Sequence, residues 1–469
     1  MPLKAFNSNI IYFSKERLLR CNYKTLSLSK ELETIINHKS KHERIKDYFD
    51  ILSGFAFKSE DYVLEGVSLV RIGDLNEEFN IEDMAKLPEE FLDQYSQYVL
   101  EQDDILVSLT GDGVIKTALV NQNGLLLNQR VGALRAKREV NIRFIHYLLS
   151  TSIVKKQFLW LSNGKAQLNI SPLDFLSIKI PIIDVNKQER ALIETSPIEQ
   201  KIKSLKSKIL PSQKVIDEVF AREFGFDYAE FERLHGIKSY MIGIDSFSNN
   251  PDLRFSAKFH REAGEYVMHE LCCITNKKIK NYLVEPICLG ASISPKDYDD
   301  NGEYYYLSMA TIKNWGFDKE NATLTSNEYS NEKTNKYVKN GDIILARSGE
   351  GTIGKVALIQ DEDIKAIFAD FTMRIRLNNY NHRFAYYYMR TTYFQYLVEI
   401  FKKGLGNNTN IFPIVIQEFP IPDISSKEQD RIVKEIQEEI NKQNAIKSEI
   451  SSLREQINEI IESVLMSKK

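Results

Sequence analysis

Residues 104–120 have the sequence DILVSLTGDGVIKTALV, and residues 342–359 have the similar sequence DIILARSGEGTIGKVALI. In both stretches an apolar run typical of a buried strand leads into a glycine-containing turn, a lysine and a second apolar run. The two stretches lie about 240 residues apart, which indicates an internal repeat of a strand-turn-strand unit. The repeat therefore predicts two similar modules within one chain.

Landmark residues on either side of this unit recur in the same order. The matching pairs are Gly54 and Gly290, Asp61 and Asp297, Tyr62 and Tyr298, Arg143 and Arg383, Phe144 and Phe384, Gln188 and Gln429, and Arg190 and Arg431. A shared ancestor explains this order more simply than chance does. Two copies of one module suit a protein that must grip two similar targets at a set distance.

Length and composition predict a globular protein of at least two domains. The 469 residues exceed the usual size of one hydrophobic core, and 43% of them are hydrophobic. No run approaches the ~20 apolar residues that a membrane-spanning helix needs. The N-terminus shows no charged region followed by an apolar stretch, as a secretory signal would. We therefore expect no membrane association and a cytoplasmic location.

Charge and cysteine content narrow the possible functions. The formal net charge is −3, which argues against a uniformly basic nucleic-acid-binding surface but allows lysines and arginines to gather on one face. Cys21, Cys272, Cys273 and Cys288 show no C-x-x-C spacing, so neither a zinc site nor a disulfide framework is indicated. Reduced and mostly buried thiols are expected.

Each copy predicts a mainly antiparallel sheet followed by helix. The expected strands are 66–72, 104–108 and 114–120 in the first copy, and 303–307, 342–346 and 355–359 in the second. Helical stretches are expected at 142–161 and 382–401, where aromatic residues recur at helical spacing. A polar loop follows each, at 163–169 and 402–410, and a short strand then leads to a proline corner.

A long helix is the clearest prediction after each module. From 427 to 465 isoleucines, leucines and a valine recur every three or four residues without glycine or proline. Such a helix needs a partner for its apolar stripe, and residues 187–224 supply one. Pro197 and Pro211 should divide this partner into two or three pieces. The two helices are expected to run antiparallel, with residues 227–240 as the connection to the second module.

The order of these features resembles the specificity subunit of a type I restriction-modification system. The resemblance is carried by the following segments: the strand-turn-strand units 106–119 and 345–358, the loop 164–171, and the exits 178–181 with Gln188 and 419–422 with Gln429. It covers essentially residues 20–465. No single motif is decisive, but the order and the duplication are specific.

The resemblance implies an α/β (α+β) fold with two pseudo-repeated target recognition domains separated by a long antiparallel two-helix coiled coil. The expected boundaries are 1–182 for an N-terminal extension and first recognition domain, 183–226 for the first spacer helix region, 227–253 for a connector, 254–423 for the second recognition domain, and 424–469 for the second spacer helix.

The resemblance also implies a function and a set of partners. Each recognition domain would read one half of a bipartite duplex DNA site, and the helices would dock methyltransferase (modification) subunits. An endonuclease/translocase (restriction) subunit would join the complex. S-adenosylmethionine, ATP and Mg would be bound by the partner subunits, and this chain would hold no cofactor and be non-catalytic.

Candidate DNA contacts lie in the turns and the polar loops. Gly349–Lys355 fits the phosphate pattern G-x-G-x-x-G, but a strand follows where a dinucleotide site requires a helix, so a tight hairpin turn is predicted. The proposed contacts are Lys116, Lys165, Gln167, Asn169, Lys355, Lys402, Lys403, Asn407 and Asn410, with the lysines on phosphates. A solvated surface turn explains the loops equally well.

Other candidate residues favour structural roles. Arg71, Arg130, Arg347 and Arg374 stand at strand edges or ends and are each interpreted as structural. The tyrosines at 304–306 and 386–388 could stack on bases, but core packing is favoured.

No catalytic constellation is evident in the sequence. No Pro-Pro pair supplies the Asn/Asp-Pro-Pro-aromatic motif of an amino-methyltransferase, and the histidines lack metal-ligand spacing. Two alternatives to the DNA-specificity hypothesis remain. One is a scaffold with two ligand-binding modules on a coiled coil, and the other is a recognition subunit of a related phage-defence methyltransferase system.

Overall fold

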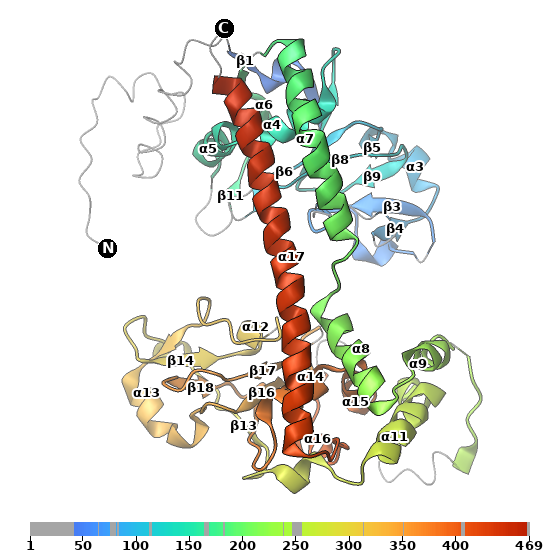
Figure 1. Ribbon diagram of the computed structural model, residues 1–469, viewed down its shortest axis with the longest axis vertical. Coiled ribbons are helices and arrows are strands. Elements are labelled where there is room, and N and C mark those ends of the chain that lie inside the picture. The colour runs from blue at the N-terminus through green and yellow to red at the C-terminus, as the bar shows by residue number, and fades with distance from the viewer. Residues whose placement is uncertain are drawn as a thin grey trace. The chain divides into compact units, whose positions relative to one another are not determined.

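The structure is a computed structural model that describes residues 42–63, 65–75, 81, 84–111, 115–163, 168–181, 183–237, 239–245, 256–312, 314–349, 351–404 and 409–466. The chain forms two compact units (Figure 1). The first unit contains Met1–Lys208 and Ser448–Lys469, and the second contains Ile209–Lys447. Within the described residues, no helix combines the length and the apolar character needed to span a bilayer.

Two sheets form the strand region of the first unit. The antiparallel sheet has the order β2 (Phe49–Ser53), β10 (Val131–Ala136), β6 (Ile105–Ser108), β8 (Thr117–Leu119). The other has the order β4 (Ala85–Leu87), β3 (Val67–Val70), β9 (Leu125–Leu127), β5 (Val99–Leu100), and its β3–β9 pair is parallel. Short pairs join β1 (His42–Arg44) to β12 (Lys179–Pro181), and β7 (Thr110–Gly111) to β11 (Leu168–Asn169).

The second unit repeats this topology except for β5, in whose place the described residues form an isolated bridge between Tyr337 and Ile367. Its antiparallel sheet has the order β13 (Cys288–Leu289), β19 (Thr372–Ile375), β16 (Ile343–Ala346), β17 (Val356–Leu358). The other sheet has the order β15 (Leu324–Thr325), β14 (Tyr304–Leu307), β18 (Ala366–Phe368), and β14–β18 is again a parallel pair. The three strands predicted in each sheet region are present, each trimmed by one to three residues at one or both ends. The strand predicted before the first proline corner is β12, whereas the one predicted before Pro422 is wrong, because the described residues there form an isolated bridge between Lys278 and Pro420. The match of strand order and direction supports the inferred duplication.

Short helices and turns complete the two units. They are η1 (Ile45–Asp47), η2 (Ser59–Asp61), α3 (Phe91–Gln94), η3 (Ser96–Tyr98) and α6 (Pro172–Leu176) in the first unit, and η4 (Ala257–His260), η5 (Ile279–Tyr282), η6 (Pro295–Asp297), α12 (Met309–Ile312), α13 (Asn327–Glu332), η7 (Thr334–Lys336) and α16 (Pro413–Ile416) in the second. The landmark aspartates Asp61 and Asp297 end equivalent 3-10 turns, η2 and η6.

The landmark glycines lie where two backbone segments approach closely. A Cβ atom added to Gly54 would lie 2.1 Å from the carbonyl oxygen of Asn128, and one added to Gly290 would lie 2.1 Å from that of Phe368. No side chain fits at such a distance. The recurrence of glycine therefore follows from the packing of the backbone.

The first aspartate of each quoted stretch is buried in an ion pair. Asp104 and Asp342 are 2% and 1% exposed. Arg135 donates to Asp104 from Nε and Nη2 at 3.0 and 2.7 Å, and Arg376 donates to Asp342 from the same two atoms at 2.7 Å each. Two parallel hydrogen bonds satisfy each carboxylate, so a charge that would be costly to bury alone is tolerated at the start of β6 and of β16.

The glycine-rich turn of the second unit is longer than predicted. Residues 347–355 connect the antiparallel neighbours β16 and β17, so the predicted hairpin is present but its turn is not tight. Gly349, Gly351 and Gly354 adopt positive φ values of 87°, 77° and 85°, and glycine is the residue that adopts such values most readily. A strand follows this loop, whereas a dinucleotide site would need a helix there.

Each predicted helical stretch is divided into two helices. The stretches contain α4 (Ile142–Leu149) with α5 (Ser152–Leu161), and α14 (His382–Arg390) with α15 (Thr392–Phe401). Thr151 and Thr391 are fully buried at the two breaks, and their hydroxyls donate to the carbonyl oxygens of Leu148 and Tyr388 at 2.6 and 2.7 Å. Both threonines adopt an extended backbone conformation that starts a new helix.

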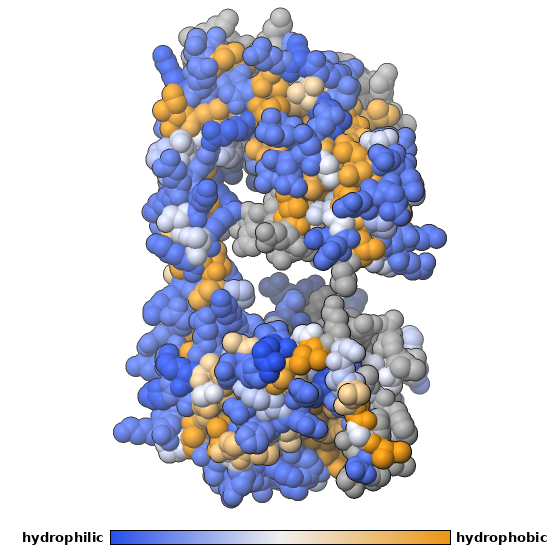
Figure 2. All heavy atoms as spheres, turned by 90° about the vertical axis from the view of Figure 1, so that its right-hand side faces the viewer, coloured by the Kyte–Doolittle hydropathy of each residue, from blue (hydrophilic) through white to orange (hydrophobic). Residues whose placement is uncertain are grey.

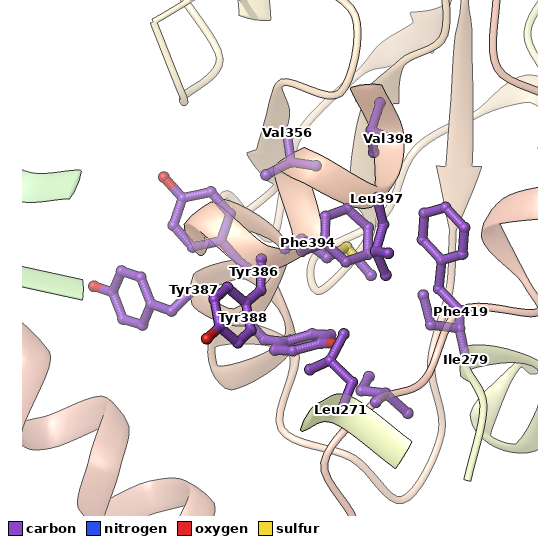
Figure 3. Close-up of a cluster of buried hydrophobic side chains, with 14 of the residues drawn as sticks. Leu271, Ile279, Val356, Tyr386, Tyr387, Tyr388, Phe394, Leu397, Val398 and Phe419 are labelled. Carbon is purple, nitrogen blue, oxygen red and sulfur yellow. The ribbon is translucent and has the colours of Figure 1, made fainter. Parts of the chain in front are cut away.

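The tyrosines of α14 belong to the core of the second unit. Figure 3 shows Tyr386, Tyr387 and Tyr388 among aliphatic and aromatic side chains from several segments, including Phe394 and Phe419. The three tyrosines are 8%, 4% and 0% exposed, so the packing role predicted for them is confirmed. In the other tyrosine run, Tyr306 is buried, while Tyr304 and Tyr305 are half-buried.

The helical region after the first module has one break. It forms α7 (Val185–Lys206) and α8 (Ser212–Phe224), and Pro211 is the N-cap residue of α8. Pro197 was expected to divide the helix but lies inside α7. Pro197 and Ile193, one turn earlier, are both exposed, so water can solvate the carbonyl group that the proline leaves without a donor.

The predicted final helix is α17 (Ser426–Met466). In the second unit α8 runs antiparallel to α17, because Leu210 donates its N–H to Gln443 while Arg222 pairs with Glu435. In the first unit Lys201 of α7 pairs with Glu449 at 2.6 Å. Helix pairing is thus present in each unit, while the predicted coiled coil stays a prediction.

The segment predicted as a connector contributes to the second core. It forms α9 (Tyr228–His235), whose Phe231 and Leu234 are buried with residues of α11 (Glu262–Ile274). The predicted domain boundaries remain a proposal. The expectation that the cysteines are mostly buried is wrong for α11, since Cys272 and Cys273 are exposed on its outer face, and Cys288 is half-buried.

Candidate nucleic-acid interface

In the first unit, several loops meet at one edge, which we call loop edge 1 and define as Leu109, Thr110, Arg130 and Asn169. Leu109 donates its N–H to the carbonyl oxygen of Arg130 at 2.9 Å, and Ile170 donates to that of Leu109 at 2.9 Å. Thr110 pairs with Asn169 in the β7–β11 ladder. Backbone hydrogen bonds therefore hold together residues that are up to 60 positions apart in sequence.

Loop edge 2 is the same construction in the second unit, defined as Arg347, Ser348, Phe371 and Asn410. Arg347 donates its N–H to the carbonyl oxygen of Phe371 at 3.0 Å, and Ile411 donates to that of Arg347 at 2.9 Å. Ser348 and Asn410 form an isolated β-bridge. Position by position, the backbone contacts reproduce those of loop edge 1.

The predicted loop contacts belong to two equivalent bridged loops. Asn163 and Asn169 exchange two backbone hydrogen bonds of 2.7 Å, and Lys403 and Asn410 exchange two of 2.8 and 2.7 Å. The Asn169 and Lys403 side chains are exposed, and Asn410 is half-buried. Three predicted contacts, Lys165, Gln167 and Asn407, lie outside the described residues.

The other predicted lysines have different surroundings. Lys116 is exposed directly before β8, and its N–H donates to Ser108 Oγ at 2.9 Å. Lys355 lies over Trp315, with Nζ 5.0 Å from the ring centroid. Lys402 Nζ lies 2.5 Å from Glu399 Oε2, and its side chain is 17% exposed. Lys116 and Lys403 are thus more accessible than Lys355 and Lys402.

Glu399 explains why Lys402 is held back. Burial raises the pKa of Glu399, but hydrogen bonds from Lys258 and Lys402 outweigh burial and lower the pKa overall. The carboxylate therefore stays charged and retains both ammonium groups. Lys402 would have to leave this pair to contact a phosphate.

The four arginines interpreted as structural divide into two classes. Arg71 pairs with Asp74, and Arg374 is buried and pairs with Glu285, as expected for structural residues. Arg130 is exposed at a φ of 71°. Arg347 donates from Nη2 to Asn410 Oδ1 at 3.0 Å. The last two belong to the loop edges, which sequence reasoning missed because each meets its neighbours through loops distant in the chain.

The segments that carry the loop edges also contain exposed apolar side chains. Leu173 of α6 and Ile414 of α16 occupy corresponding positions and are 79% and 68% exposed. Phe371 and Phe412 are 48% and 41% exposed. On the face in Figure 2, apolar residues lie scattered among hydrophilic ones in both units. Contacts with the thymine methyl group would use such side chains.

The described part of the chain contains no candidate metal-binding site. Within it, no three His, Cys, Asp or Glu side chains come together closely enough to hold an ion. What the loop edges offer is hydrogen-bond donors and acceptors, cations and exposed apolar groups. These are the groups with which proteins bind a polar, anionic ligand such as duplex DNA.

The known proteins similar to this chain are all of one kind. The family described as "Type I restriction modification DNA specificity domain" matches this chain at residues 37–210 and 254–455. The specificity subunit of the type I restriction enzyme MjaVIII from Methanocaldococcus jannaschii is 31% identical over 153 residues, covering 31% of this chain and 36% of that protein. The EcoAI specificity subunit from Escherichia coli is 25% identical over 171 residues, covering 35% of this chain and 29% of that protein.

These matches span about a third of the length of the two curated relatives. Among solved structures, the S subunit of a type I restriction-modification system from M. genitalium is similar over 92% of this chain and 98% of that chain, with 13% identity and a TM-score of 0.36.

Proposed function

Because the chain belongs to the family of type I restriction-modification DNA specificity domains, we propose that it is the non-catalytic specificity subunit of such a complex. Each unit reads one half of a bipartite duplex site through its loop edge. Methyltransferase subunits dock on the helical regions, and an endonuclease/translocase subunit completes the assembly. Those partner subunits bind S-adenosylmethionine, ATP and Mg, and this chain binds none of them.

The observation that carries this proposal is the duplication of the loop edge. Two modules with the same backbone contacts, Leu109 to Arg130 and Arg347 to Phe371, present different side chains on one scaffold. That is the arrangement needed to bind two targets of the same chemical class and different sequence.

The residues proposed to contact DNA act in two ways. Lys116, Lys165, Lys355, Lys402 and Lys403 bind phosphates, while amides contact base edges. Those amides are Gln167, Asn169, Asn407 and Asn410. Lys116 and Lys403 should contribute most among the described lysines, because both side chains are exposed.

Methylome sequencing of a host with and without the chain tests the proposal. A split methylation motif that depends on the chain is the expected result, and a methylome that does not change rejects it. Binding assays with the full chain and its methyltransferase subunits add a second readout. Lys116→Ala should weaken binding to all duplexes alike and reduce the slope of log K against log salt by about one.

A further inference from the structure

The two loop edges exchange the places of an arginine and an apolar residue. In loop edge 1 the strand end carries Leu109 and the neighbouring turn carries Arg130. In loop edge 2 the strand end carries Arg347 and the turn carries Phe371. The same backbone hydrogen bond joins the two positions in each unit, at 2.9 and 3.0 Å. Each edge therefore presents one guanidinium group. In loop edge 1 the arginine is the residue that accepts the backbone hydrogen bond, and in loop edge 2 it is the residue that donates it.

Arg347 is held in a fixed orientation. Its Nη2 donates to Asn410 Oδ1 at 3.0 Å, and its Cζ lies 5.9 Å from the ring centroid of Phe412. Its Nε is buried without a hydrogen-bond partner in the described structure. A guanidinium fixed in this way suits an acceptor that offers two hydrogen-bond acceptors in one plane.

Arg130 is placed at a cost in backbone energy. It adopts a φ of 71°, a region that side chains with a Cβ rarely occupy, and its side chain is exposed. Glycine would relieve this strain, and the side chain makes no ion pair with the described residues. Strained non-glycine residues cluster at functional sites, where the side chain itself is needed.

We infer that Arg130 and Arg347 each read a guanine base in the half-site bound by their own unit. The inference rests on the proposed function and names specificity residues within it. Arginine donates two hydrogen bonds to O6 and N7 of guanine in the major groove, the commonest specific contact between protein and DNA. Besides its proposed contact with a base edge, Asn410 is a positioning residue for Arg347, because its Oδ1 accepts the hydrogen bond from Arg347 Nη2.

The exchange of places has a consequence for the target. The guanidinium of loop edge 1 comes from the turn between β9 and β10, whereas that of loop edge 2 comes from the end of β16. The guanine therefore occupies a different place relative to each module.

The test uses the full chain with its methyltransferase subunits and a duplex carrying its methylation motif. Replacing each guanine of one half-site by 7-deazaguanine removes the N7 acceptor without any change to the protein. One such replacement per half-site should weaken wild-type binding about 5- to 150-fold. The replacement that weakens wild-type binding in the half-site read by the second unit should not weaken binding by the Arg347→Ala variant. The corresponding replacement in the half-site read by the first unit should not weaken binding by the Arg130→Gly variant.

Variants separate base contact from phosphate contact. Arg347→Ala, or Arg347→Lys if the alanine variant unfolds, should relax the motif at one guanine in one half-site. Arg130→Gly should relax the other half-site while the protein keeps or gains thermal stability. Arg233→Ala removes an exposed arginine of α9 that pairs with Glu230, and it should leave the motif unchanged.

Each outcome decides the inference. Equal weakening on every duplex would make the arginines phosphate contacts and overturn it, as would a 7-deazaguanine effect that persists in the variants. If the wild-type complex selects no motif at all, the proposed function fails first, and that failure is visible without any variant.

Discussion

Gly54 and Gly290 have little freedom to change. An alanine Cβ at either position would meet a backbone carbonyl oxygen at 2.1 Å, so the strands must separate. We expect Gly54→Ala and Gly290→Ala each to lower the free energy of unfolding by about 3 kcal/mol. Urea denaturation measures this. Gly73→Ala is the matched control, because a Cβ there meets no atom within 4 Å and should cost less than about 0.5 kcal/mol.

His146 should make the first unit sensitive to acid. Burial lowers its pKa to about 4 in the folded chain, while its Nε2 hydrogen-bonds to Thr117 Oγ1 at 3.0 Å. The unfolded chain takes up a proton near pH 6.5. Stability contributed by the neutral imidazole is therefore complete above pH 6.5 and is lost as the pH falls toward 4.

His146→Gln should remove this acid sensitivity. Unfolding midpoints at pH 7, 6 and 5 should fall less steeply in the variant than in the wild type, although the variant loses some packing. As a control, NMR titration of the folded wild type measures the pKa of His146 directly. The nearby Glu199 raises this pKa, but burial lowers it by more. A His146 pKa near 6.5 in the folded chain would contradict the expectation.

At the scale of elements, the break between α7 and α8 depends on one side chain of α17. Gln443 is 5% exposed, and its Oε1 accepts the N–H of Leu210 at 2.8 Å. Gln443→Met nearly keeps the volume and removes the acceptor, so the part-buried N–H of Leu210 loses its partner. The expected cost is about 1–3 kcal/mol in urea unfolding. Gln456→Met, at an exposed position of α17, should cost almost nothing.

The accuracy of the element predictions followed the strength of the local signal. The uninterrupted apolar stripe predicted 427–465, and α17 spans Ser426–Met466. Thr151 and Thr391 end helices through hydrogen bonds to carbonyls of the preceding turn, and threonine carries no distinct signal for such a break. Pro197 predicted a break in the helix, but α7 continues through it, because the proline lies at an exposed position where water can solvate the carbonyl group that it leaves without a donor.

The candidate site was less accessible to sequence reasoning than the fold. The polar loops at 163–169 and 402–410 could be singled out because they recur. Arg347 meets Asn410, 63 residues away, and Arg130 meets Leu109 through backbone atoms alone. No periodicity encodes such meetings, so their side chains could be judged only after the loops were placed.

At the scale of the whole molecule, the first unit depends on the far end of the chain. Ile450, Leu453, Ile457, Ile461 and Leu465 are all buried, and the N–H of Ser152 donates to Glu462 at 2.7 Å. Ile461→Asp places a charge at a fully buried position and should cost at least about 3 kcal/mol.

Hydrogen exchange with mass spectrometry shows where this cost falls. Protection should be lost at 142–206 and retained at 382–401, because the second unit has its own core. Ser452→Asp introduces the same side chain at an exposed position of α17 and should leave both regions protected. Equal loss in both regions would mean that the units do not unfold separately.

The use of residues 448–466 by the first unit has a consequence for biosynthesis. A ribosome at about 5–20 residues per second releases the second module before the first has received its closing helix. The nascent first module must wait for tens of seconds with apolar surface uncovered. A nonsense codon late in the reading frame, or a stalled ribosome, would therefore harm the part of the protein that was made first.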